Sequence, residues 1–152
     1  MANRNLEIIK KLSVKRIWNM FLLRSSFYIS RIARKPIHFG TPAAISIEPT
    51  TACNLKCPEC PSGLRQFSRP TGNLKPAINT KILNDLGGNL QYINYYFQGE
   101  PFINPDFLNF VKEAVDKKIY VLTSTNAHFV SNKTANDIID SGLSELIISI
   151  DG

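Results

Sequence analysis

The three cysteines of the chain are the residues best suited to chemistry, and they lie close together in the sequence. Cys53, Cys57 and Cys60 form a C-x3-C-x2-C run, and the chain has no other cysteine. Three thiols in so short a loop cannot all pair as disulfides, so the grouping favours a metal site. A structural zinc site takes four ligands, whereas an iron–sulfur cluster held by three thiolates leaves one iron open. An open iron is a place where a reaction can occur.

Three further motifs follow the cysteines, each directly after an apolar stretch that predicts a strand. They are Gly99-Glu100-Pro101, Thr123-Ser124-Thr125-Asn126 and Ser149-Ile150-Asp151-Gly152. In this order the motifs resemble those of the radical S-adenosylmethionine (radical SAM) superfamily, namely its C-x3-C-x2-C cluster motif, its GEP motif, a polar strand end and an S-x-D-G ending. The resemblance runs from about Ala43 to the last residue, and the four motifs together are more specific than any one of them.

The resemblance implies a [4Fe–4S] cluster held by Cys53, Cys57 and Cys60, with the amino and carboxylate groups of SAM on the open iron. In this family an electron then enters the sulfonium group, and SAM breaks into methionine and a 5′-deoxyadenosyl radical. Thiolates suit the role because they are soft anionic ligands for cluster iron. The alternative from the residues alone is a zinc site with a fourth ligand elsewhere, and His38 and His128 are the only histidines available for it.

The resemblance also implies which residues bind SAM. Gly99, Glu100 and Pro101 are expected to hydrogen-bond the SAM amino group, since a glycine lets the main chain approach closely. Polar residues at the later strand ends are expected to reach the SAM carboxylate or the ribose hydroxyls, and these are Ser124, Asn126, Ser149 and Asp151. Simpler interpretations stay open, because Glu100 can be a solvated acid, Pro101 can end a strand, and Ser, Asn and Asp are common turn residues. The sequence assigns no catalytic residue.

One position departs from the family pattern. Many family members carry an aromatic residue just before the third cysteine, near the adenine, and this chain has Glu59 there. Adenine packing is then expected from Phe97 or from residues beyond the end of this sequence. The turn residues of segment 61–76 predict a loop beside the cluster, in which Arg65 or Arg69 can meet an acidic substrate or can simply be solvated.

The elements that must position these motifs alternate between strand and helix from Ala43 onward. The β-branched and aromatic residues predict strands at Ala44 to Ile47, Tyr92 to Phe97, Ile119 to Leu122 and Leu146 to Ile150. Capping signals predict a helix that begins after Asn104, one from Ser131 to Gly142, and one that ends at Gly87-Gly88. Strands joined by helices form a parallel sheet through right-handed crossovers. All four motifs then fall at the carboxyl ends of strands, where such folds place active sites.

The predicted class is therefore α/β with a parallel sheet. The resemblance implies a partial (β/α) barrel of six units, of which this sequence supplies about four strands. The chain is expected to be an incomplete fragment, with residues 1–40 as a helical arm and 41–152 as the N-terminal part of a radical SAM core. The later strands and any C-terminal auxiliary-cluster (SPASM) domain lie outside it.

The net positive charge belongs to residues 1–40. They hold nine Lys or Arg against Glu7, whereas residues 41–152 hold nine basic and eleven acidic residues. Apolar residues recur near helical spacing among these bases and predict a basic amphipathic helix, namely Leu6, Ile9, Ile17, Phe21, Tyr28 and Ile32. The helix can pack on the domain and expose its polar side, or it can place its aromatic residues on an anionic membrane surface or an acidic partner.

The arm does not predict a membrane span or a secretory signal. Its apolar runs are only a few residues long and are interrupted by Asn19, Arg24 and Arg31, whereas a span needs about 20 residues. We therefore expect a cytoplasmic protein, free or at a membrane surface. Nucleic-acid binding is not expected, because the bases do not belong to a nucleic-acid-binding module.

The sequence as a whole predicts an enzyme that binds a [4Fe–4S] cluster and SAM and forms a radical that modifies a peptide or a small molecule. The resemblance further implies an electron donor such as a reductase, a flavodoxin or a ferredoxin. The closest likeness is to members with SPASM extensions. The alternative is a non-catalytic iron–sulfur or electron-transfer module, which SAM would leave unperturbed.

Overall fold

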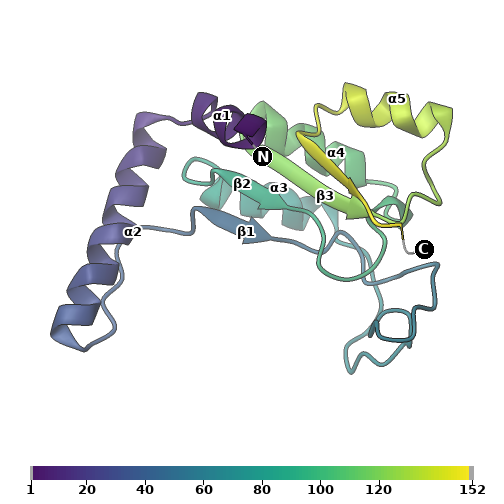
Figure 1. Cartoon of the computed structure of the whole chain (residues 1–152), viewed down its shortest axis with the longest axis horizontal. Coiled ribbons are helices and arrows are strands. Elements are labelled where there is room, and N and C mark those ends of the chain that lie inside the picture. Colours follow the sequence, from purple (N-terminus) through teal and green to yellow (C-terminus); the bar gives the residue numbers. More distant parts are fainter. Residues whose placement is uncertain (1, 151–152) are drawn as a thin grey trace.

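Four parallel strands form one sheet in the computed structural model, which describes residues 2–150 (Figure 1). The strands are β1 (Ala44–Ser46), β2 (Tyr92–Asn94), β3 (Tyr120–Thr125) and β4 (Glu145–Ile148), and they lie in their order along the chain. Residues Ala44, Tyr92 and Tyr120 stand in register across the first three strands. The predicted α/β class and the parallel sheet are confirmed.

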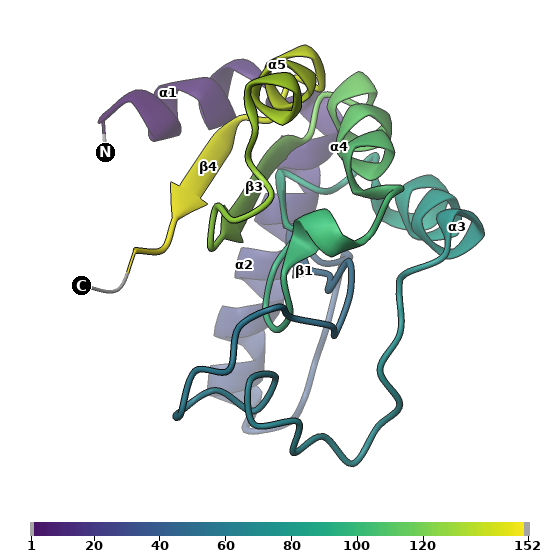
Figure 2. The same ribbon diagram turned by 90° about the vertical axis from the view of Figure 1, so that its right-hand side faces the viewer.

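A helix follows each of the first three strands. They are α3 (Pro76–Leu86), α4 (Phe107–Asp116) and α5 (Asn132–Asp140), and a short 3-10 helix, η1 (Pro101–Ile103), precedes α4. The three helices lie along one side of the molecule, as the side view shows (Figure 2). This is the crossover pattern of a parallel sheet, in which a helix returns the chain to the edge where every strand begins.

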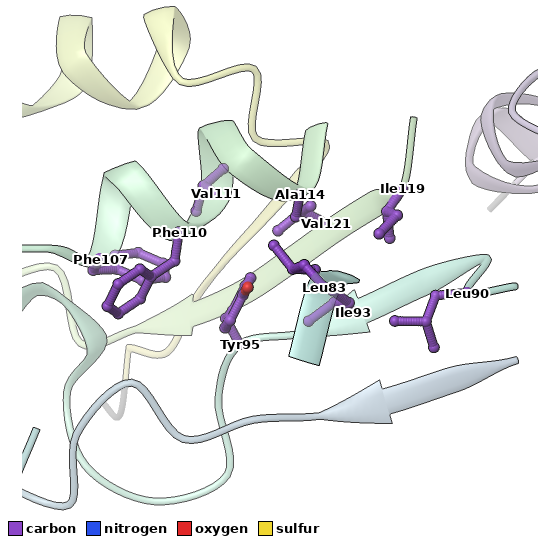
Figure 3. Close-up of a cluster of buried hydrophobic side chains, with 10 residues drawn as sticks. All are labelled: Leu83, Leu90, Ile93, Tyr95, Phe107, Phe110, Val111, Ala114, Ile119 and Val121. Atoms are coloured by element: carbon purple, nitrogen blue, oxygen red, sulfur yellow. The ribbon is translucent and has the colours of Figure 1, made fainter. Parts of the chain in front are cut away.

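The core lies between the sheet and the helices α3 and α4. Ile93 of β2 and Val121 of β3 point toward these helices, and alternate residues of each strand point to the other face. Ten buried side chains make up this core (Figure 3), namely Leu83, Leu90, Ile93, Tyr95, Phe107, Phe110, Val111, Ala114, Ile119 and Val121. Because this core packs two strands against two helices, it holds the ends of these strands in fixed positions relative to one another.

The buried phenol of Tyr95 has a partner within this core. It donates a hydrogen bond of 2.6 Å to Asn79 Oδ1, and Asn79 Nδ2 donates to Glu113 Oε2 at 2.8 Å. Burial raises the pKa of Tyr95 well above its ordinary value, and the nearby Glu113 acts in the same direction. The polar group is thereby satisfied where water cannot reach it.

The helical arm consists of two helices, α1 (Ala2–Lys10) and α2 (Val14–Ala33). Ser13 separates them and caps α2, because its side chain accepts a hydrogen bond from the amide of Arg16 at 3.3 Å. Lys11 Nζ then ties this junction to the sheet through the Ile119 carbonyl at 3.2 Å. Across residues 2–150, none of the helices combines the length and apolarity that crossing a bilayer requires.

The capping predictions had different outcomes. Ser131 caps α5 as expected, with its side chain accepting from Thr134 N at 3.2 Å, and Gly142 after the helix has a positive φ of 74°. The prediction that Asn104 caps α4 is wrong. The side-chain nitrogen of Asn104, Nδ2, donates to the carbonyls of Pro49 and Leu74 at 2.7 and 3.1 Å, and the helix begins at Phe107. Its Oδ1 does accept a hydrogen bond from the amide of Asp106 at 3.0 Å, but Asp106 is the residue directly before the helix, so Asn104 caps the turn that precedes α4.

Candidate cofactor site

A cavity of about 200 Å³ lies at the carboxyl ends of the strands. Its walls come from the cysteine loop and from the segments after β2, β3 and β4, and the residues that line it are Cys53, Leu55, Cys57, Cys60, Tyr96, Phe97, Gly99, Glu100, Ser124, Thr125, Asn126 and Ser149. Parallel strands end at the same edge of a sheet, which explains why motifs far apart in the sequence meet here. The structure thus brings together eight of the ten predicted site residues.

Pro101 is not among the residues that line this cavity. Pro101 is buried and begins the 3-10 helix η1 behind it, so it does not end a strand. Asp151 lies outside the residues that the structure describes. Asp151 therefore stays a prediction from the resemblance.

The cysteine loop is closely packed around Cys57. The amide of Cys60 donates to the carbonyl of Cys57 at 3.2 Å, which turns the chain back on itself. A Cβ on Gly63 would lie 2.6 Å from the amide nitrogen of Cys57 and 2.8 Å from its carbonyl oxygen. Such distances do not occur in proteins, so a glycine is required at this position.

The three thiols have the properties of cluster ligands. Each is free and partly exposed, and each borders the same cavity. Within residues 2–150, no three His, Cys, Asp or Glu side chains lie close enough together to hold a single metal ion. In an iron–sulfur cluster each thiolate binds a different iron, so the ligands do not share one ion. The donor set, three soft ligands beside an open cavity, fits a cluster with one open iron.

The segment that begins with Gly99 passes directly against the residues before Cys53. Gly99 has a positive φ of 78°, and a Cβ there would lie 2.3 Å from the Thr50 carbonyl oxygen and 2.8 Å from that of Ala52. The next amide, that of Glu100, donates to the Ala52 carbonyl at 2.8 Å. The glycine is therefore needed both for its backbone conformation and for the close approach of two chains.

Glu100 is buried, with only 2% of its surface exposed. One carboxylate oxygen accepts hydrogen bonds from Thr125 Oγ1 at 2.7 Å and from the amide of Phe102 at 3.3 Å. The other accepts from the amide of Asn126 at 2.9 Å. The interpretation of Glu100 as a solvated loop acid is wrong, because the carboxylate joins the segment after β2 to the end of β3.

The remaining polar residues of the cavity take part in two hydrogen-bonded pairs. Asn126 Nδ2 donates to Asn54 Oδ1 at 2.8 Å, which connects the end of β3 to the cysteine loop. The hydroxyls of Ser124 and Ser149 lie 3.0 Å apart and form a hydrogen bond across β3 and β4. These contacts place amide and hydroxyl groups in the wall of the cavity that the cysteines also line.

Sequence reasoning missed Gln98 and Ser62. Ser62 Oγ donates to Gln98 Oε1 at 2.9 Å and accepts from the amide of Gly99 at 3.1 Å, and Cys60 Sγ lies 3.6 Å from the same Gln98 oxygen. These contacts fix the third cysteine to the segment after β2. The only signal in the sequence is adjacency, since Gln98 precedes Gly99 and Ser62 follows Cys60 by two positions.

Of the residues considered for adenine, Phe97 borders the cavity and is 72% exposed, whereas Glu59 is exposed and does not line it. The two candidate arginines line a neighbouring cavity of about 310 Å³ that also reaches Cys53. Arg69 is already paired with Glu48 at 2.6 Å, and this hydrogen bond raises the pKa of the arginine. Arg65 is therefore the better placed of the two to meet an acidic group.

The chain has relatives among characterised proteins. A PqqA peptide cyclase from Bradyrhizobium diazoefficiens is 31% identical to it over 116 residues, which are 75% of this chain and 30% of that protein. A mycofactocin maturase MftC from Mycobacterium tuberculosis is 28% identical over 116 residues, 73% of this chain and 28% of that protein. The chain thus spans less than a third of the length of these curated relatives. No protein-family model matches it.

Solved structures also resemble the chain. BtrN in complex with AdoMet and 2-DOIA superposes with a TM-score of 0.62 and 23% identity, over 71% of this chain and 45% of that one. Streptococcus suis SuiB bound to S-adenosylmethionine gives a TM-score of 0.60 and 24% identity, over 84% of this chain and 29% of that one. At these identities the similarity to the solved structures shows the fold only. The predicted partial barrel is confirmed in this respect.

Proposed function

The chain resembles the N-terminal part of a radical SAM core in both sequence and fold, and from this premise we propose that it binds a [4Fe–4S] cluster and SAM in the cavity at the strand ends. The observation that carries the proposal is the composition of that cavity. It is lined by three partly exposed thiols and by amide and hydroxyl groups that form two hydrogen-bonded pairs. Residues 41–152 supply all of these groups, which is why we assign the core to them.

Each part of the cavity has a distinct task in this proposal. Cys53, Cys57 and Cys60 hold the cluster, and their loop is shaped by backbone contacts. The main chain at Gly99, which borders the cavity, offers backbone groups to the SAM amino group in this proposal. When bound together, the cluster and SAM supply a 5′-deoxyadenosyl radical through reductive cleavage of SAM. Phe97, the exposed aromatic ring on the rim, is the candidate for packing against the adenine.

The polar residues of β3 and β4 orient the SAM carboxylate and ribose. Ser124, Ser149 and Asn126 have hydrogen-bonding groups on the cavity wall, and Asp151 is expected to join them from the segment after β4. Glu100 acts differently, because its carboxylate is already occupied by three protein donors. Its proposed task is to fix the backbone of Asn126 so that the wall keeps its shape.

The substrate class we propose is a peptide. One relative is a PqqA peptide cyclase, and a structural neighbour, SuiB, has been solved bound to its precursor peptide SuiA. Arg65, beside Cys53 in the neighbouring cavity, is suited to an acidic group of such a peptide. The proposal requires an electron donor, such as a reductase, a flavodoxin or a ferredoxin. A SPASM extension in the complete protein remains a prediction.

Electron paramagnetic resonance tests the proposal on protein reconstituted anaerobically and reduced with dithionite. We expect a reduced [4Fe–4S] signal that changes when SAM is added. The signal should be lost in Cys57→Ala and kept in Glu59→Ala, which alters an exposed residue of the same loop. A cluster signal that SAM leaves unchanged would favour the alternative, an iron–sulfur module for electron transfer. Stoichiometric zinc with no cluster would contradict both.

A further inference from the structure

The outward face of α2 is apolar, although the helix lies at the surface of the domain. Its large side chains are strongly exposed, with Ile32 at 85%, Trp18 at 60% and Phe21 at 58%. Together with Val14 and Tyr28, these residues lie four, three, seven and four positions apart, so they form one apolar stripe along the helix, which Arg24 interrupts between Phe21 and Tyr28. A row of large exposed apolar side chains on one face of a helix marks a candidate site of interaction.

The polar side of α2 faces the protein and keeps the apolar stripe outside. Asn19 exchanges two hydrogen bonds of 2.9 Å with the backbone of Thr41, one in each direction. Ser30 Oγ donates to the Ile37 carbonyl at 2.7 Å and accepts from the Ile37 amide at 2.9 Å. The segment after the helix is thus bound along its polar side, so rotating the stripe inward would break four hydrogen bonds.

A buried arginine fixes the same orientation at the start of the helix. Arg16 is 3% exposed and donates to the carbonyls of Lys11 at 2.5 Å, Lys118 at 2.7 Å, Lys117 at 2.8 Å and Gly87 at 3.3 Å. Three of these carbonyls belong to the ends of α3 and α4, where the helix dipole is negative. The orientation of α2 is therefore built into the fold.

The charges along α2 all have one sign. Arg24 lies over the ring of Tyr28 at 5.2 Å and Arg31 over the ring of Phe27 at 5.8 Å, so cations flank the exposed aromatic rings. The sequence has no acidic residue between positions 8 and 47, and its basic residues there are Lys10, Lys11, Lys15, Arg16, Arg24, Arg31, Arg34 and Lys35. Aromatic and apolar side chains edged by cations match the headgroup layer of an anionic membrane.

We propose that α2 lies in the headgroup layer of an anionic membrane, with its apolar stripe toward the acyl chains and its arginines at the lipid phosphates. A groove of about 310 Å³ lies between α2 and Ala43. It is lined by the apolar side chains of Met20, Leu23 and Phe27 and by the cationic Arg24, so it can contact both an acyl chain and a lipid phosphate. A second copy of the chain suits this face less well, because two such helices would bring like charges together.

The position of α2 leaves the candidate cofactor site accessible. The helix stands beside the end of the sheet where the strands begin, whereas the cysteine loop lies at the opposite end (Figure 1). A membrane bound to α2 would therefore not cover the cavity. The membrane contact is also independent of the cluster, so either proposal can fail without the other.

Tryptophan fluorescence of the full chain tests the membrane contact directly, because Trp18 is the only tryptophan and lies in the stripe. We expect its emission to shift to shorter wavelength when vesicles of phosphatidylcholine with phosphatidylglycerol are titrated in. Vesicles of phosphatidylcholine alone should give a much weaker shift. Sedimentation of the protein with the same vesicles measures binding without the fluorophore.

Matched substitutions separate the charges from the apolar stripe. Arg31→Gln is expected to weaken vesicle binding roughly fivefold. The double variant Arg24→Gln/Arg31→Gln is expected to weaken it roughly 25-fold. Ile32→Ser should weaken binding through lost apolar contact. The controls Lys133→Gln and Ile139→Ser change equally exposed residue types on α5 and should leave binding unchanged. Circular dichroism verifies that each variant stays folded. We expect this result because the substituted side chains are exposed.

Three results would overturn the proposal. The first is an unchanged Trp18 emission and no sedimentation with anionic vesicles. The second is equal binding to both vesicle types, because the arginines would then have no role. The third is a Trp18 shift that follows protein concentration without vesicles, which would assign the stripe to a second copy of the chain.

Discussion

Two neighbouring residues, Gly99 and Glu100, hold the cavity together in opposite ways. Gly99 does so by lacking a side chain, because the carbonyls of Thr50 and Ala52 occupy the space where a Cβ would be. Glu100 does so with its carboxylate, which accepts hydrogen bonds from Thr125 Oγ1 and from the backbone beyond it. The GEP segment is therefore both a wall of the cavity and the link between the cysteine loop and β3.

The first prediction concerns Gly99→Ala. The positive φ and the contacts with two carbonyls predict a loss of about 1–3 kcal/mol or more in the free energy of unfolding. Urea denaturation measures it, and the reconstituted cluster content should fall as well, because the displaced segment borders the cysteines. Gly72→Ala is the matched control, since no atom lies within 4 Å of its Cβ position. Equal effects of the two substitutions would contradict the prediction.

The second prediction concerns Glu100→Gln. The amide keeps the shape of the side chain but turns an NH₂ group toward a donor, either Thr125 Oγ1 or the amide of Asn126. Hydrogen bonds to a charged group contribute about 1.5–3 kcal/mol each, and we expect a loss of this size in urea denaturation. Glu59→Gln in the exposed part of the cysteine loop should change stability by less than about 0.5 kcal/mol. A Glu100→Gln variant as stable as the parent would show that the carboxylate is not needed as an acceptor.

At the scale of the elements, α2 is attached to the domain through the ends of other helices. The last carbonyls of a helix have no partner within it, and those near the ends of α3 and α4 point to the guanidinium of Arg16. Burial lowers the pKa of Arg16, but its ordinary value is so high that the side chain stays charged. One cation thus joins three helices.

The third prediction follows from this attachment. Arg16→Met keeps an extended side chain but removes the donor from the buried carbonyl of Gly87 and from the partly buried contacts with Lys117 and Lys118. Breaking such a buried network is expected to lower the free energy of unfolding by roughly 3 kcal/mol, measured by urea denaturation. The exposed neighbour Lys15→Met is the control and should have little effect. If both variants unfold alike, the attachment of α2 does not depend on Arg16.

The sequence could not predict this attachment. The basic residues of the arm indicated an exposed polar side, whereas Arg16 is buried and the apolar stripe faces outward. The reason is that hydrophobic periodicity predicts a helix but not which side of it faces the protein, and three of the four carbonyls that bind Arg16 lie more than 70 residues away in the sequence. The same limit applies to Asn104, whose side chain donates to the carbonyls of Pro49 and Leu74, because these partners lie far from it in the sequence.

At the scale of the whole molecule, the order of the strands was predictable and the contacts between their ends were not. Alternating strand and helix signals predict a parallel sheet, and such a sheet places the cysteine, GEP and Ser149 motifs at one edge. The hydrogen bonds between side chains at that edge depend on how far each strand extends relative to its neighbours. Contacts such as Gln98 with Ser62 and Glu100 with Thr125 therefore appear only in the folded chain.

The last prediction concerns the pH dependence of stability and involves α1, β3 and β4. The phenol of Tyr120 is buried and donates to Glu145 Oε2 at 3.0 Å, and burial together with this hydrogen bond raises its pKa to about 12. In the unfolded chain a tyrosine has a pKa of about 10. Its contribution to stability is then complete below pH 10 and is lost between pH 10 and 12, because the unfolded phenol ionises first.

Removing this phenol should flatten the alkaline limb of the stability curve. We expect the parent to lose about 2–3 kcal/mol more than Tyr120→Phe between pH 10 and 12, measured by urea denaturation at each pH. Near neutral pH the variant should be less stable by about 1 kcal/mol, since one hydrogen bond is lost. Tyr92→Phe changes the more exposed tyrosine beside it and is expected to keep the slope of the parent. An alkaline limb of the same slope in Tyr120→Phe would mean that its ionisation does not oppose folding, and that α1 and β4 leave the phenol open to water.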